Sequence, residues 1–89
     1  MIKHYHIKVS GRVQNVGFRF HTRKTAQSLG LTGYVSNLPD GSVMVRAEGE
    51  ETLLEELVSW CRKGPDWAEV SRLEFDEEPL EGFTGFHIR

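Results

Sequence analysis

The amino-acid sequence predicts an α+β fold of the ferredoxin-like, or split βαβ, type, in which two helices cover one face of an antiparallel sheet. Three observations support this prediction. Apolar and polar residues alternate in two separate parts of the N-terminal half, as expected of strands with one buried face. Two other stretches repeat apolar residues at helical spacing, and the turn sequence LPDG at residues 38–41 joins two strands into a hairpin. The expected order is strand, helix, strand, strand, helix, strand and a short final strand.

The N-terminal half contains a strand, a helix and a hairpin. The first strand is predicted by three apolar residues that alternate with polar ones: Tyr5, Ile7 and Val9. The first helix is predicted by residues that recur at helical spacing: Phe18, Thr22, Ala26 and Leu29. It ends before Gly30, a residue that suits the left-handed conformation at a helix end. We expect the hairpin strands at Leu31–Asn37 and Ser42–Glu48.

The C-terminal half supplies the second helix and two further strands. We expect the helix between Gly49 and Gly64, because one of its faces carries an apolar stripe: Leu54, Leu57, Val58 and Cys61. In the fourth strand, at about Ala68–Phe75, the apolar residues change from one parity to the other, which predicts a bulge or a partly exposed edge. A short final strand is expected at residues 86–89, where Phe and Ile alternate with His and Arg.

Length and cysteine content narrow the class of protein. A chain of 89 residues predicts one domain, residues 1–89, with a modest core. We find no signal peptide and no stretch apolar enough to cross a bilayer, so we expect no membrane association. Cys61 is the only cysteine and shares a helix face with apolar residues, which predicts a buried side chain rather than a nucleophile and favours a cytoplasmic protein. Nothing indicates an obligate oligomer, so we expect a monomer.

Charge is distributed unevenly along the chain. The formal net charge is −2, but residues 1–47 hold seven Lys and Arg against one acidic residue, whereas residues 48–89 hold four against twelve. The basic half would attract an anion, and the acidic half would repel an extended polyanion. This distribution favours a small anionic ligand over nucleic acid.

The segment GRVQNVGFR, residues 11–19, has the features of an oxyanion-binding turn. It joins an alternating strand to a helix through a turn rich in glycine and asparagine, which can direct several backbone N–H groups at one anion. The helix that follows adds the positive end of its dipole, and Arg19 adds a planar fork of donors suited to phosphate or carboxylate.

A second polar side chain, Asn37, stands at the end of the second strand, just before the hairpin turn. In the predicted fold the first and second strands run parallel with the third between them, so their carboxyl ends lie at the same edge of the sheet. We therefore expect Arg19 and Asn37 to converge. Taken singly, Arg19 is better explained as a solvated helix residue and Asn37 as an Asx-turn residue.

Several motifs together resemble the signature of the acylphosphatase family. They are GRVQNVGFR at residues 11–19, GLTGYVSNLPDGSV at residues 30–43, Gly49, and FHIR at residues 86–89, and they span almost the whole chain. The resemblance implies an enzyme that hydrolyses small acyl phosphates to a carboxylate and inorganic phosphate. It also implies that neither a metal ion nor another cofactor is required.

The resemblance also implies roles for individual residues. Arg19 would bind the phosphoryl oxygens, and Asn37 would orient the attacking water. Backbone N–H groups of the preceding loop would assist Arg19. This loop consists of Arg12, Val13, Gln14, Asn15, Val16, Gly17 and Phe18. Because an amide cannot remove a proton at neutral pH, we expect a phosphate oxygen of the substrate to accept the proton of the water.

Asn15 is a departure from the family pattern, which usually has glycine at this position. Asparagine is the best replacement for glycine if φ is positive there, because its cost in the left-handed region is below the roughly 1 kcal/mol of other residues. We therefore expect the loop to persist, with altered stability or lower activity.

The sequence leaves three alternatives. A catalytically silent anion-binding or RNA-binding module could share this fold, but the third strand, SVMVRAEG, lacks the aromatic residues of an RNA-binding sheet. A domain of a larger maturation protein that processes carbamoyl phosphate is possible, but FHIR at the end of the sequence favours a free-standing enzyme. Finally, His4, His6 and His87 could suggest a metal site, yet solvated or sheet-covering histidines are the simpler interpretation.

Overall fold

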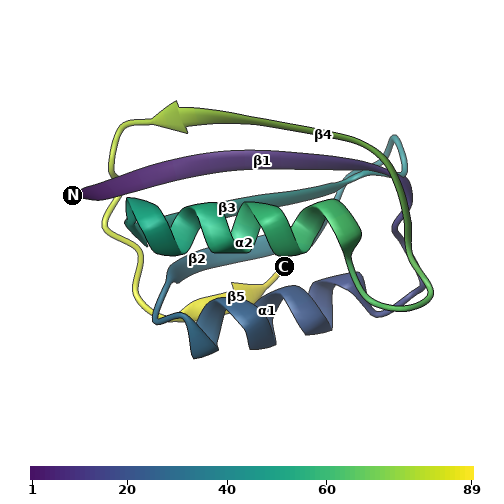
Figure 1. The fold of residues 1–89 in the computed structure, drawn as a ribbon, viewed down its shortest axis with the longest axis horizontal. Helices are drawn as coiled ribbons and strands as arrows, with labels where there is room; N and C mark the ends of the chain where they lie inside the picture. Colours follow the sequence, from purple (N-terminus) through teal and green to yellow (C-terminus); the bar gives the residue numbers. More distant parts are fainter.

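The computed structural model describes residues 1–89 and confirms the predicted order of elements (Figure 1). The elements are β1 (Ile2–Arg12), α1 (Phe18–Ser28), β2 (Thr32–Asn37), β3 (Val43–Glu50), α2 (Glu51–Lys63), β4 (Glu69–Glu78) and β5 (Phe86–Ile88). Both helices lie on the same face of the sheet (Figure 1). Neither helix is long and apolar enough to span a lipid bilayer.

The strands form one sheet in the order β4-β1-β3-β2-β5. β3 pairs antiparallel with both β1 and β2, so β1 and β2 run parallel with β3 between them, as predicted. The fifth strand differs from the expected antiparallel arrangement, because β5 pairs parallel with β2. The reason lies in the 79–85 loop. β4 ends beside His4 and β5 starts beside Gly33, so the loop crosses the sheet without changing ends.

The hydrophobic core lies between the sheet and the two helices. Its strand residues are those predicted from the alternation, among them Tyr5, Ile7 and Val9, and the helices add the predicted apolar stripes. Burial of these side chains provides most of the driving force for folding. Cys61 is fully buried among them, and burial raises the pKa of its thiol to about 12, so it is a packing residue, as predicted.

The predicted irregularity of the fourth strand is a β-bulge at a sheet edge. Ser10 lies opposite Arg72 and Gly11 lies opposite Val70, so Ser71 has no partner in β1. The extra residue changes the parity of the apolar side chains along β4, which explains the pattern in the sequence. β4 is an outer strand of the sheet, and Phe75 remains partly exposed there.

Two strands are longer than the sequence predicts. β3 continues through Gly49 and Glu50, which pair with Lys3 and Ile2 of β1, so α2 begins at Glu51. β4 extends to Glu78 because its acidic end lies beside the basic start of β1. There the Lys3 Nζ atom is 3.3 Å from a carboxylate oxygen of Glu77.

A buried polar pair fixes the 79–85 loop on the face of the sheet that lacks helices. His4 and Glu48 are cross-strand partners, and both are buried. The Glu48 carboxylate accepts hydrogen bonds from the backbone N–H groups of residues 81–83, and His4 Nδ1 lies 3.0 Å from the carbonyl oxygen of Pro79. Burial alone would raise the pKa of Glu48, but these N–H donors and His4 outweigh it and lower that pKa.

Candidate active site

The carboxyl ends of β1 and β2 meet at one edge of the sheet. Val9 of β1 and Asn37 of β2 both lie opposite Val43 of β3, one on each side of it. The chain leaves β1 after Arg12, passes through residues 13–17 and enters α1 at this same edge. The topology therefore brings the loop, the start of α1 and the end of β2 together, as predicted.

Residues 13–17 form a loop with unusual backbone dihedral angles, and its N–H groups have no acceptors in the protein. Asn15 has a φ of 63° and Gly17 a φ of 79°, and Asn15 is the only non-glycine residue with positive φ. Asparagine tolerates this region better than other residues with a side chain, which agrees with the prediction for this position. The N–H groups of residues 13–17 donate no hydrogen bond within the protein.

Arg19 lies in the first turn of α1, where helical N–H groups also lack intrahelical acceptors. Its side chain turns toward β2 and β5, and the guanidinium Nη1 donates to the backbone oxygen of Arg89 at 3.3 Å. No carboxylate forms an ion pair with this guanidinium. The remaining N–H groups of the fork are available to an anion.

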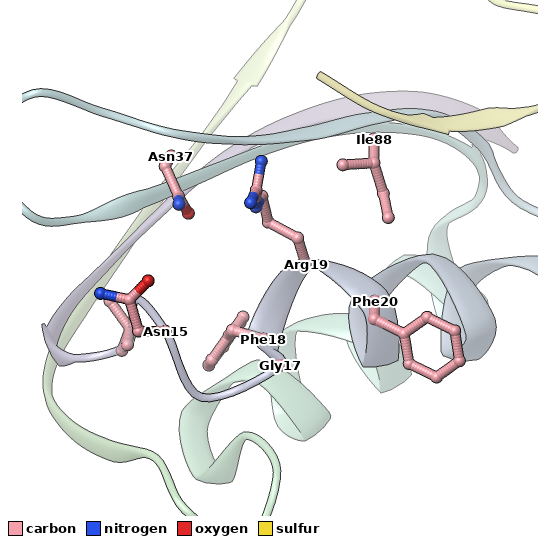
Figure 2. Close-up of a pocket in the computed structure, with 8 residues that line it drawn as sticks. Asn15, Gly17, Phe18, Arg19, Phe20, Asn37 and Ile88 are labelled. Atoms are coloured by element: carbon pink, nitrogen blue, oxygen red, sulfur yellow. The ribbon is translucent and has the colours of Figure 1, made fainter.

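Asn37 presents an unpartnered acceptor at the same place. Its Oδ1 atom is buried and has no hydrogen-bond partner. Buried polar atoms are nearly always paired, so an orphan of this kind at a pocket wall indicates that a ligand or water completes it. In Figure 2 the side chains of Asn37 and Asn15 extend from opposite sides into the space beside Arg19.

These groups enclose a pocket of about 180 Å³. It is lined by Val13, Asn15, Gly17, Phe18, Arg19, Phe20, Asn37 and Ile88. The lining contains no carboxylate, imidazole or thiol, so no side chain in it can act as a general base near neutral pH. Phe20 and Ile88 were not predicted as site residues. Phe20 lies outside the apolar stripe predicted for the first helix, and Ile88 is brought to the pocket by the parallel pairing of β5 with β2.

Three of the predicted loop residues turn their side chains away from the pocket. Arg12 ends β1 and faces Glu69 at 3.4 Å, with both side chains exposed. Gln14 Nε2 donates at 2.9 Å to the carbonyl oxygens of both Leu38 and Ser42, which ties the loop to the β2–β3 turn. Val16 packs against the core. Val13, Asn15, Gly17 and Phe18 line the pocket.

His4 and His6 lie two residues apart on β1, whereas His87 lies on β5. His4 is buried against Glu48, and His87 Nε2 lies 2.9 Å from the carbonyl oxygen of Thr84. No group of three or more His, Cys, Asp or Glu side chains is arranged to hold a metal ion. His21, two residues after Arg19, lies behind Gly17 and does not line the pocket.

The acylphosphatase family model matches residues 5–88. The chain belongs to the acylphosphatase family. It is 54% identical over 80 residues to an acylphosphatase of Acaryochloris marina, an alignment that covers 90% of this chain and 86% of that protein. The solved structure of an acylphosphatase from Coxiella burnetii superposes with a TM-score of 0.96 at 40% identity, covering 99% of this chain and 93% of that one. These findings confirm the family and the enzyme class predicted from the sequence.

A larger protein also contains this unit. The crystal structure of T. kodakarensis HypF matches with a TM-score of 0.82 at 41% identity, covering 97% of this chain but 11% of that chain. The acylphosphatase fold therefore occurs both in proteins of about this length and within longer ones.

Proposed function

We propose that this acylphosphatase hydrolyses small acyl phosphates in a phosphate cradle formed by Arg19 and the backbone of residues 12–18, with Asn37 orienting the attacking water. The observation that carries the proposal is a set of unpartnered polar groups around one small pocket. The N–H groups of residues 13–17 and the Asn37 oxygen have no partner in the protein, and Arg19, Asn37 and part of the 13–18 segment line a pocket of about 180 Å³. Such an array of donors suits a phosphoryl group.

The reaction requires the protein mainly to position the water and the phosphoryl group and to stabilise the phosphoryl charge. Water attacks phosphorus in line as the bond between phosphorus and the carboxylate oxygen breaks, and the bonding electrons leave with the carboxylate. The leaving carboxylate needs no proton, and the proton of the water passes to a phosphoryl oxygen. This substrate-assisted route accounts for a pocket without a general base.

Asn37 suits the role of orienting the water. Its Oδ1 atom has no partner in the protein and can accept a hydrogen bond from the water, which directs a lone pair of the water at phosphorus. Arg19 and the loop amides offset the negative charge on the phosphoryl oxygens, so the proposed chemistry requires no metal ion.

The rest of the molecule supports a small soluble substrate. The helix-free face of the central strands carries His, Lys, Arg and Met side chains rather than the stacking aromatics of an RNA-binding sheet. The chain covers 86% of the length of the Acaryochloris marina protein. We therefore propose a monomeric, cytoplasmic protein in which residues 1–89 form one acylphosphatase domain that does not bind nucleic acid.

The decisive experiment is hydrolysis of benzoyl phosphate by the purified protein in ¹⁸O-labelled water containing a chelator. We expect turnover, with the label in inorganic phosphate and none in benzoate, because the water attacks phosphorus. Label in benzoate would show attack at the carbonyl carbon and overturn the mechanism. Phosphate binding without turnover would instead favour the alternative, a catalytically inactive anion-binding module.

A further inference from the structure

Phe20 is an exposed aromatic residue at the rim of the pocket. It directly follows Arg19 in the first turn of α1 and lines the pocket, yet its side chain is 50% exposed. Large apolar side chains that remain exposed beside a ligand pocket often mark a recognition surface.

Phe20 is not part of the hydrophobic core. It belongs neither to the core cluster nor to the partly buried residues that pack against it. Its ring lies against two neighbours on the helix, with the His21 ring edge-on at a centroid distance of 5.1 Å and Arg23 Cζ at 6.0 Å from its centroid. These contacts leave much of the ring accessible to a ligand.

The accessible apolar surface of the pocket comes mainly from two residues. Val13 and Phe18 are 1% and 2% exposed and form the base of the pocket. Phe20 is exposed and Ile88 is partly exposed, so these two side chains offer apolar atoms to a bound molecule.

The position of these residues matches the path of the leaving group. Figure 2 shows the side chains of Asn15 and Asn37 on one side of Arg19, and those of Phe20 and Ile88 on the other. In an in-line displacement the leaving group departs opposite the attacking water. If Asn37 holds the water, the acyl group extends toward Phe20 and Ile88.

We propose that Phe20, together with Ile88, forms an acyl-binding subsite that favours aromatic or extended apolar acyl groups over short ones. This inference rests on the proposed function, because it uses the roles of Arg19 and Asn37. The Phe20 ring packs against the acyl group while the cradle holds the phosphoryl group. Substrate preference is then set by a residue outside the phosphate cradle.

The test compares kcat/KM for benzoyl phosphate and acetyl phosphate in the wild type, Phe20→Ala and Phe20→Leu. We expect Phe20→Ala to lower kcat/KM for benzoyl phosphate by about fivefold, mainly through KM, and that for acetyl phosphate by less than about twofold. Phe20→Leu should recover part of the loss, because it restores apolar surface. Inhibition by inorganic phosphate should stay unchanged in both variants, since phosphate contacts only the cradle.

Trp67→Ala is the matched control, because Trp67 is another exposed aromatic residue and lies outside the pocket. It should leave the ratio of the two kcat/KM values unchanged. An equal loss for both substrates in Phe20→Ala, no loss for either, or the same change of ratio in Trp67→Ala would overturn the subsite. A folded wild type that hydrolyses neither substrate would overturn the proposed function itself.

Discussion

The two ends of the sheet differ in whether their polar groups have hydrogen-bond partners within the protein. At the end where β1 and β2 finish, the N–H groups of residues 13–17 and the Asn37 oxygen have no partner in the protein. At the other end, Glu48 and His4 are more deeply buried, yet the 79–85 loop supplies their partners.

This difference distinguishes polar groups that bind a ligand from polar groups that support the structure. An unpartnered buried polar group costs free energy, and a protein retains it where a ligand supplies the missing hydrogen bond. A satisfied group such as Glu48 instead holds two segments together. We therefore expect substitutions at the first end to change activity with little effect on stability, and substitutions at the second end to do the reverse.

The largest effect is expected for Arg19→Ala. Removing the guanidinium takes away the main charge that offsets the phosphoryl group, so kcat/KM for benzoyl phosphate should fall by about a thousandfold. Urea unfolding should change little, because Arg19 makes one hydrogen bond and no ion pair. A loss of stability large enough to explain the loss of activity would refute the contrast between the two ends. Arg19→Lys keeps the positive charge but loses the planar set of donors, so its kcat/KM should lie between those of the wild type and Arg19→Ala.

Asn37→Ala should lower kcat by about a hundredfold, because the water loses its orienting acceptor. The free energy of unfolding should stay the same or rise slightly, since the variant removes a buried oxygen that has no partner. Steady-state kinetics and urea unfolding on the same preparations measure both quantities. A change confined to KM would assign Asn37 to phosphate binding instead.

Glu48→Ala tests the other end of the sheet. The variant leaves three backbone N–H groups and His4 without their shared acceptor, so we expect a loss of about 3 kcal/mol in the free energy of unfolding. At temperatures where the variant is folded, kcat should change by less than about threefold, because the pocket lies at the opposite end. A catalytic defect like that of Asn37→Ala would contradict the separation.

The lowered pKa of Glu48 also predicts a pH dependence. A carboxyl whose pKa is lower in the folded state contributes stability above its ordinary value of 4.5, and this contribution is lost as the pH falls through the folded pKa. Unfolding measured at about pH 6 and about pH 3 should show the gap between wild type and Glu48→Gln narrowing in acid. A gap that stays constant would show that Glu48 does not titrate with unfolding.

The smallest effects concern Asn15. Asn15→Ala should destabilise the fold by about 1 kcal/mol, because alanine tolerates the positive φ less well. Asn15→Gly should change stability by less than about 0.5 kcal/mol, since relief of the φ cost is offset by the greater entropy of the unfolded chain. Its kcat/KM should equal or slightly exceed that of the wild type, because an amide leaves the pocket wall. Lower activity in Asn15→Gly would show that the amide contributes to binding.

Much of the fold could be predicted because local sequence patterns determine most of its strands and helices. Alternation located the strands, and the change of parity before Phe75 correctly indicated a bulge, which the structure places at Ser71. The direction of β5 could not be predicted, because a three-residue strand shows alternation without indicating its partner. The burial of His4 and Glu48 was also missed. Both occupy polar positions of their strands, and only the distant 79–85 loop covers them.

The site was predictable to a similar degree. Arg19 and Asn37 were placed together by the order of the strands, and the structure shows them lining one pocket. Which loop side chains face the pocket could not be predicted, because it depends on backbone dihedrals in an irregular segment. Gln14 illustrates this, since its amide turns outward to the hairpin carbonyls. Phe20 and Ile88 were missed because their place in the pocket wall depends on tertiary structure rather than on a motif.

The parallel pairing of β5 with β2 has a consequence for folding kinetics. The pocket takes residues from the loop after β1, from the end of β2 and from β5, segments that are far apart in the sequence. Contacts between distant segments form late, because long loops must close first. During refolding, the helices should therefore form before any enzymatic activity returns.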